Sequence, residues 1–301
     1  MLTICLSLGT AACYGTADFF GGLATRTSSV TKVLLTSHGV SLVLLLIAMI
    51  FLPTPHPTSS DWMLSVAAGV CALVGLLALY RALGGGHMVV VSAISAVLSA
   101  LVPAMVGVAA GEQLAAIGWA GVALGLAATV LVSAGAHAVG ADSDPIGRTV
   151  VLSIVAGLGI GLMLALTSRC TAEAGAAPVV VMRTMSVVAL GSFVGSGWLR
   201  QSRPGPGGPR QARPSGVARP SFLPSRPGLA ALAGCLDVLG TILFMRASLA
   251  GAVAVAAVLA AQYPLVTATM ARIGLGERLT RTQVVGFAAT LVSVGLLAAG
   301  R

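Results

Sequence analysis

Long apolar runs follow one another along the chain, with few polar positions between them. Each run has about 20 residues, the length of an α-helix that crosses roughly 30 Å of hydrocarbon. The alternating pattern of a membrane barrel is absent, and backbone inside a bilayer must satisfy its own hydrogen bonds, so the runs predict helices. We expect ten membrane helices, at about 3–24, 32–52, 62–82, 87–109, 115–134, 148–169, 177–199, 228–248, 251–272 and 281–299.

An internal repeat divides the chain into two halves. Residues 69–135 recur at 234–300 without a gap, at an offset of 165. In the first two helices of each half the offset is 145 or 146, so the extra residues of the second copy fall at 200–227. The matching pairs include Gly15/Gly161, Ser41/Ser186, Gly69/Gly234, Gly75/Gly240, Arg81/Arg246, Gly111/Gly276, Glu112/Glu277 and Gly121/Gly286.

The repeat predicts an all-α integral membrane protein with ten transmembrane helices arranged as two inverted five-helix repeats. Five is an odd number, so the two copies cross the membrane in opposite directions, as in many secondary transporters. We expect the first repeat at 1–135, a connecting loop at 136–147 and the second repeat at 148–300. In such proteins the substrate site lies between the copies, near the bilayer midplane.

Two prolines lie inside predicted helices. Pro103 and Pro264 interrupt the fourth and ninth helices within about one turn of equivalent positions. A proline frees backbone groups, which a membrane helix tolerates where neighbours or a cavity receive them. Each proline therefore indicates either a simple kink or a functional break in its helix.

The composition predicts a multi-pass membrane protein of the cell membrane. It is 57% hydrophobic and only 8% charged, against about 25% charged in soluble domains. Much of the net charge of +9 comes from the segment 200–227, which also holds half of the 14 prolines. Such a segment predicts a disordered linker near lipid headgroups and not a nucleic-acid site. The expected partners are membrane lipid and a small-molecule substrate, for a monomer or a homodimer.

Several short motifs resemble those of a known family. They are Tyr14-Gly15-Thr16-Ala17-Asp18-Phe19-Phe20-Gly21-Gly22, Tyr80-Arg81-Ala82-Leu83, Gly111-Glu112, Arg183 and Gly276-Glu277-Arg278. Together with the helix count and the repeat, they resemble the EamA-type transporters of the drug/metabolite transporter superfamily. The resemblance implies export or exchange of small metabolites, amino acids or drugs, often driven by an ion gradient. The chain departs from the pattern at Gln113, where the second copy has Arg278, and in its long linker.

The orientation in the membrane stays open. Loops that follow odd-numbered helices hold thirteen Lys and Arg residues, and the opposite side holds three. The positive-inside rule would therefore place both termini outside the cytoplasm. The family resemblance implies the opposite, with both termini inside.

Four ionisable residues lie at membrane depth: Asp18, His38, Arg183 and Asp237. Placing such a charge at a helix centre costs about 2.5–3.5 kcal/mol, so each should face the bundle interior. We expect Asp18 and Asp237 to line a central cavity, with His38 and Arg183 near its two ends. A carboxylate removed from water there can exchange a proton. The alternative is that the four form static ion pairs or interhelical hydrogen bonds.

Other polar residues have predicted roles as well. Tyr14, Gln262 and Tyr263 are candidates for substrate contact, although such side chains also pack between helices or lie at membrane interfaces. Glu112 and Glu277 follow Gly111 and Gly276, each of which ends a helix. We expect structural turns there, with each carboxylate close to the positive N-terminus of the next helix.

The sequence lacks the motifs of ATP-driven pumps, metal sites and nucleophilic enzymes. It has no Gly-x-x-x-x-Gly-Lys-Ser/Thr loop, no metal-ligand spacing and no nucleophile motif, so we expect no enzyme, metal or cofactor. The sequence predicts a secondary active transporter that exports a small organic metabolite or drug by alternating access, coupled to a proton gradient. The alternative is a membrane-embedded scaffold or sensor without transport. The substrate charge stays open, because the carboxylates suit a cation and Arg183 suits a carboxylate.

Overall fold

The described part of the chain folds into helices. The structure is a computed structural model, and it describes residues 1–25, 28–51, 56–83, 88–134, 146–201, 227–275 and 280–299. No strand occurs within these ranges. The α-helices are α1 (Leu2–Thr25), α2 (Val30–Phe51), α3 (Ser59–Leu83), α4 (Met88–Ala109), α5 (Ala116–Ala134), α6 (Ile146–Thr167), α7 (Ala177–Gln201), α8 (Pro227–Ala250), α9 (Val253–Ala260), α10 (Tyr263–Leu275) and α11 (Arg281–Ala299), and a 3-10 helix spans Ala172–Ala174.

The expected all-α membrane character is confirmed. Within the described ranges, 7 helices are long and apolar enough to cross a membrane. They lie in α2, α3, α6, α7, α8, the stretch Val253–Gly274 and α11. The remaining expected segments form α1, α4 and α5, and their crossing of the membrane stays a prediction. Most of the predicted linker at 200–227 lies outside the described residues.

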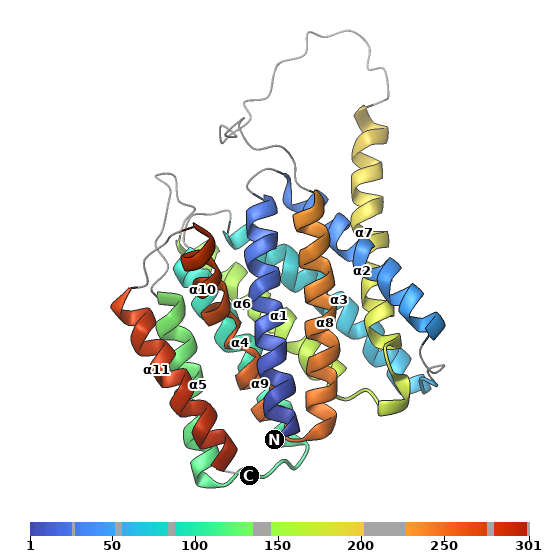
Figure 1. The fold of residues 1–301 in the computed structure, drawn as a ribbon. Coiled ribbons are helices and arrows are strands. Elements are labelled where there is room, and N and C mark those ends of the chain that lie inside the picture. The colour runs from blue at the N-terminus through green and yellow to red at the C-terminus, as the bar shows by residue number, and fades with distance from the viewer. Residues whose placement is uncertain are drawn as a thin grey trace.

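The helices pack side by side as a bundle (Figure 1). Helix α1 packs mainly against α8, α3 against α6, and α5 against α11. Helices α2 and α7 also pack directly against each other. The start of α1 and the end of α11 lie at the same end of the bundle (Figure 1).

The two prolines behave differently. Pro103 lies inside the continuous helix α4. The expected helix at 251–272 is instead two helices, because α9 ends at Ala260 and α10 begins at Tyr263, directly before Pro264. Pro264 has no backbone N–H, so it cannot continue the hydrogen bonding of α9.

The short helix α9 lies in the core. All eight of its residues are buried. One apolar cluster joins Val255 and Val258 to Ile4 of α1 and Leu297 of α11. A second joins Ala256 and Ala260 to Phe244 of α8 and Leu164 of α6. By contrast, the residues of α10 from Tyr263 to Met270 are all partly exposed. The bundle is therefore closed around α9 and looser around α10.

The turn between α4 and α5 fixes the start of α9. Gly111 has φ of 92°, a left-handed conformation that favours glycine, and the Glu112 amide donates back to the Gly107 carbonyl at 3.1 Å. The Glu112 carboxylate accepts from the amides of Val253 at 2.8 Å and Ala254 at 3.2 Å. Glu112 is thus near a helix N-terminus, as expected, but the helix is α9 of the other half and not the next helix, α5.

The sequence pattern could not reveal this partner, because it lies 141 residues away in the chain. The corresponding turn at Gly276 and Glu277 lies outside the described residues, so its predicted role stays a prediction.

We predict that Glu112→Ala lowers the free energy of unfolding by about 1–2 kcal/mol, because two amides at the start of α9 lose their acceptor. Thermal unfolding of the purified protein in detergent measures the loss. Gln113→Ala, at an exposed neighbouring position in the same turn, is the matched control and should leave the stability unchanged. Equal stability of the two variants would contradict the capping role.

Candidate functional site

The interruption between α9 and α10 is held directly against α1. The Gln262 amide donates to the Leu259 carbonyl at 3.2 Å, in a tight turn where the helical pattern ends. Gly15 of α1 lies against the Tyr263 carbonyl, so closely that a side chain on Gly15 would collide with it. The Thr267 hydroxyl donates to the Gly15 carbonyl at 2.9 Å. The break is therefore a fixed part of the bundle.

An ion pair with a buried guanidinium lies beside this region. The guanidinium of Arg183 on α7 pairs with the carboxylate of Asp237 on α8, and the Arg183 side chain is 5% exposed. Arg183 Nη1 lies 3.1 Å from Nε2 of His38 on α2, and Nη2 lies 3.5 Å from the Thr241 hydroxyl. Because a guanidinium only donates, His38 Nε2 must be the acceptor, which makes His38 neutral at this contact.

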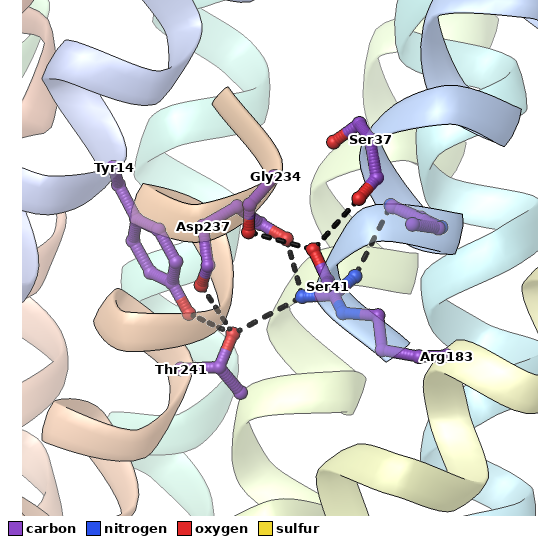
Figure 2. Close-up of polar contacts among 8 residues, drawn as sticks. Tyr14, Ser37, Ser41, Arg183, Gly234, Asp237 and Thr241 are labelled. Atoms are coloured by element: carbon purple, nitrogen blue, oxygen red, sulfur yellow. Dashed lines mark hydrogen bonds and ion pairs between the residues drawn. The ribbon is translucent and has the colours of Figure 1, made fainter. Parts of the chain in front are cut away.

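Further hydrogen bonds join α1 and α2 to α8 around the pair (Figure 2). The Tyr14 hydroxyl donates to Thr241 at 3.1 Å, and Thr241 donates to the Asp237 backbone carbonyl at 2.9 Å. The Ser41 hydroxyl donates to the Gly234 carbonyl at 2.7 Å. We call Tyr14, His38, Arg183, Asp237 and Thr241 the central polar cluster. It draws its side chains from four helices.

Asp18 lies next to this cluster on α1. Tyr14 contacts Thr241, and further along α1 Gly21 faces Ala233. Residue numbers rise along α1 while they fall along α8, so the helices are antiparallel, and Asp18 lies opposite Asp237 between these two contacts. The two carboxylates interact electrostatically. Asp18 has no hydrogen-bond or ion-pair partner among the described residues.

Asp18 faces the interior and is nevertheless exposed. Ser7, Ala11 and Asp18 follow one another on one stripe of α1, at spacings of four and then seven residues, and Ser7 and Ala11 are buried. The side chains along this stripe therefore change from buried to exposed at Asp18. Tyr263, at the start of α10, interacts electrostatically with Asp18. The break, the two tyrosines and the two carboxylates thus lie around one position in the bundle.

The structure brings together most of the predicted site residues: Tyr14, Asp18, His38, Arg183, Asp237 and Tyr263. The expectation that His38 and Arg183 lie near opposite ends of a cavity is wrong, since their side chains are in contact. The position of a residue along its helix does not determine which neighbouring helix it meets, and α2 and α7 pack against each other. The two positions therefore meet where the helices cross.

Gln262 lies apart from the central polar cluster. Its amide nitrogen donates to the Gly125 carbonyl at 3.0 Å and contacts Thr129 at 3.1 Å, and its oxygen accepts from Thr290 at 3.0 Å. It links the turn between α9 and α10 to α5 and α11. Gln262 also lines an apolar pocket of about 250 Å³ between α1, α10 and α11. Leu291 of this pocket is 74% exposed, so the pocket opens toward the lipid.

Sequence reasoning missed Thr241 and Ser41. Thr241 lies one turn after Asp237 on the same face of α8, and that spacing was the available signal. Ser41 carried no comparable signal, because a serine in a membrane helix more often bonds the carbonyl one turn back, and Ser41 does so as well, at 2.8 Å.

No group of three or more His, Cys, Asp or Glu side chains that could hold a metal ion occurs in the part of the chain that the structure describes. The chemistry available at this position is therefore that of a carboxylate, a buried ion pair and two phenols.

Comparison with known proteins adds the fold alone. No family model matches the chain, and no curated protein matches it. In all, 28 solved chains match it in structure. One of them, described only as "Crystal structure of protein", aligns over 97% of this chain and 95% of its own, with a TM-score of 0.66 and 16% sequence identity. The arrangement of helices is therefore one that solved proteins share.

We predict that substitutions of the two residues of the ion pair lower the stability by different amounts. Asp237→Asn leaves a guanidinium buried without its counter-charge, and such a loss costs about 3–5 kcal/mol. Arg183→Met should cost less, because the Asp237 side chain is 32% exposed and can reach water. Thermal unfolding in detergent compares the two variants, and a larger loss for Arg183→Met would contradict the pairing described.

Proposed function

We propose that this protein is a secondary active transporter of the cell membrane, which exports a small organic solute by alternating access coupled to a proton gradient. The observation that carries the proposal is the exposed, unpartnered Asp18, placed inside an apolar bundle opposite Asp237 and beside a broken helix. An ionisable group at such a depth is costly and usually serves transport. Broken helices form the binding sites of many transporters.

Matching contacts in the two halves support an inverted repeat. Gly15 lies against Tyr263, and its counterpart Gly161 lies against Leu98, the counterpart of Tyr263. The helix pairs behave in the same way, because α1 packs on α8 while their counterparts α6 and α3 pack on each other.

A second glycine pair follows the same rule. Gly240 lies against Tyr14, and its counterpart Gly75 lies against Ile160, the counterpart of Tyr14. Such a relation is expected of inverted-repeat transporters, whose binding site lies between the copies.

Three polar residues of the site, Asp18, Asp237 and Thr241, have apolar counterparts in the other copy. The counterparts of Asp18, Asp237 and Thr241 are Leu164, Ala72 and Leu76. The same helix pairing therefore forms with apolar side chains at these positions, as around the buried Leu164. Because the fold does not require the polar groups, their presence favours a role in function.

The difference between α9 and α10 supports access from one side. Helix α9 is fully buried, and it lies toward the end of the bundle where α1 begins (Figure 1). Asp18 and the partly exposed α10 lie toward the other end. A transporter open to one side and closed to the other has this asymmetry, and alternating access exchanges the two states.

The resemblance to EamA-type transporters agrees with this proposal. The rival function is a membrane scaffold or sensor without transport. A scaffold would need the packing between helices but not an exposed carboxylate, so it would tolerate neutralisation of Asp18. The two functions therefore differ in a measurable way.

We predict that the purified protein in proteoliposomes moves a solute from pooled amino acids, metabolites and organic cations when a pH gradient is imposed. Asp18→Asn should reduce this flux to the level of protein-free vesicles, because the exchangeable carboxylate is gone. Glu173→Gln is the matched control, since Glu173 is exposed in the loop between α6 and α7.

Folding is checked for each variant by thermal unfolding. Absence of gradient-dependent flux for every pool, with folded wild-type protein, would favour the scaffold. Full flux through Asp18→Asn would remove Asp18 from the transport mechanism.

A further inference from the structure

The charge of a substrate is constrained by how Arg183 is bound. Asp237 neutralises its guanidinium, and His38 and Thr241 lie against the two terminal nitrogens. Arg183 Nε has no partner among the described residues, but this atom is fully enclosed. A substrate carboxylate would have to displace Asp237 or enter a closed region. Arg183 therefore does not offer a free site for an anion.

The site carries one unbalanced negative charge. The groups that face Asp18 are Asp237 on α8, with Arg183 behind it, and Tyr263 on α10. His38 is neutral where it accepts from Arg183. Two carboxylates against one guanidinium leave a single negative charge, and Asp18 is the exposed, unpartnered carboxylate. In a low-dielectric bundle such a charge strongly favours a cationic partner.

Aromatic residues lie near this carboxylate. Two of the 3 tyrosines of the chain are beside it: Tyr14, one turn earlier on α1, and Tyr263 on α10. Phe19 follows Asp18 directly and lies against Gly274 of α10. Ring faces attract ammonium and guanidinium groups, and quaternary ammonium ligands bind in sites of this kind.

A metal ion fits this position less well than an organic cation. Hard metal ions require six or more oxygen ligands, and the described residues contain no group of acidic or other ligating side chains suited to a metal. The Tyr14 and Thr241 hydroxyls already donate to protein acceptors. A single carboxylate with aromatic neighbours is instead the arrangement that recognises an alkylammonium group.

We propose that the substrate is an organic cation, whose ammonium or amidinium group pairs with Asp18 between Tyr14 and Tyr263. This inference rests on the proposed transport function and deepens it by assigning the charge of the substrate. The sequence leaves the charge of the substrate open. In the structure Arg183 is paired with Asp237, whereas Asp18 has no partner among the described residues.

The test is equilibrium dialysis of the purified full-length protein in detergent, with radiolabelled benzyltrimethylammonium and, separately, phenylacetate, at the same ionic strength. The wild type should bind benzyltrimethylammonium saturably and should not bind phenylacetate. Asp18→Asn should weaken cation binding by roughly tenfold or more. Glu173→Gln makes the same charge change in a distant loop and should bind as the wild type does.

Asp18→Glu keeps the charge and should retain more of the binding than Asp18→Asn, which separates loss of charge from a general disturbance. Thermal unfolding confirms that each variant is folded. Saturable binding of phenylacetate, absence of benzyltrimethylammonium binding, or equal cation binding by wild type and Asp18→Asn would each overturn the proposal.

The dialysis experiment requires no gradient and no flux, so its outcome is separate from that of the transport assay. If the protein transports solutes of another pool in proteoliposomes but does not bind benzyltrimethylammonium, the transport function is supported and the assignment of a cationic substrate is contradicted. If benzyltrimethylammonium binds through Asp18 but no pool of solutes is transported, the cation-binding site is supported and the transport function is contradicted.

Discussion

The polar site of this protein depends on the ion pair between Arg183 and Asp237. A guanidinium inside an apolar bundle must be neutralised, because burying it alone costs several kcal/mol. Asp237 supplies the counter-charge, and His38 and Thr241 lie against the remaining terminal donors. This pairing joins α7, α8 and α2. It also determines which carboxylate at the site is free, and that carboxylate is Asp18.

The packing of the helices places Asp18 where it can act. Gly15 brings α1 against the break between α9 and α10, so Asp18 lies beside Tyr263 and opposite Asp237. Glu112 holds the start of α9 from the other half of the chain. The buried α9 closes one end of the bundle, and the exposed Asp18 marks the other. Among the described residues, Asp18 is therefore the exposed carboxylate without a partner at this position.

Much of this architecture follows from the sequence, because membrane helices are local and strongly patterned. The apolar runs predict the helices, and the rarity of charges points to Asp18, His38, Arg183 and Asp237. Contacts between distant segments could not be predicted in the same way. The contact of His38 with Arg183 depends on how α2 and α7 cross, and a depth counted from helix ends does not contain that information. The short interruption before Pro264, in contrast to the continuous helix through Pro103, likewise depends on packing.

The role of the ion pair is tested most directly by changing its charges and measuring the affinity for benzyltrimethylammonium by equilibrium dialysis. Arg183→Met/Asp237→Asn removes both charges and keeps the net charge of the site. Asp237→Asn alone makes the site neutral, because the positive charge of Arg183 then balances the negative charge of Asp18. We predict that the double variant binds with close to the wild-type affinity and that Asp237→Asn binds much more weakly. Equal affinities of Asp237→Asn and the double variant, with both folded, would contradict it.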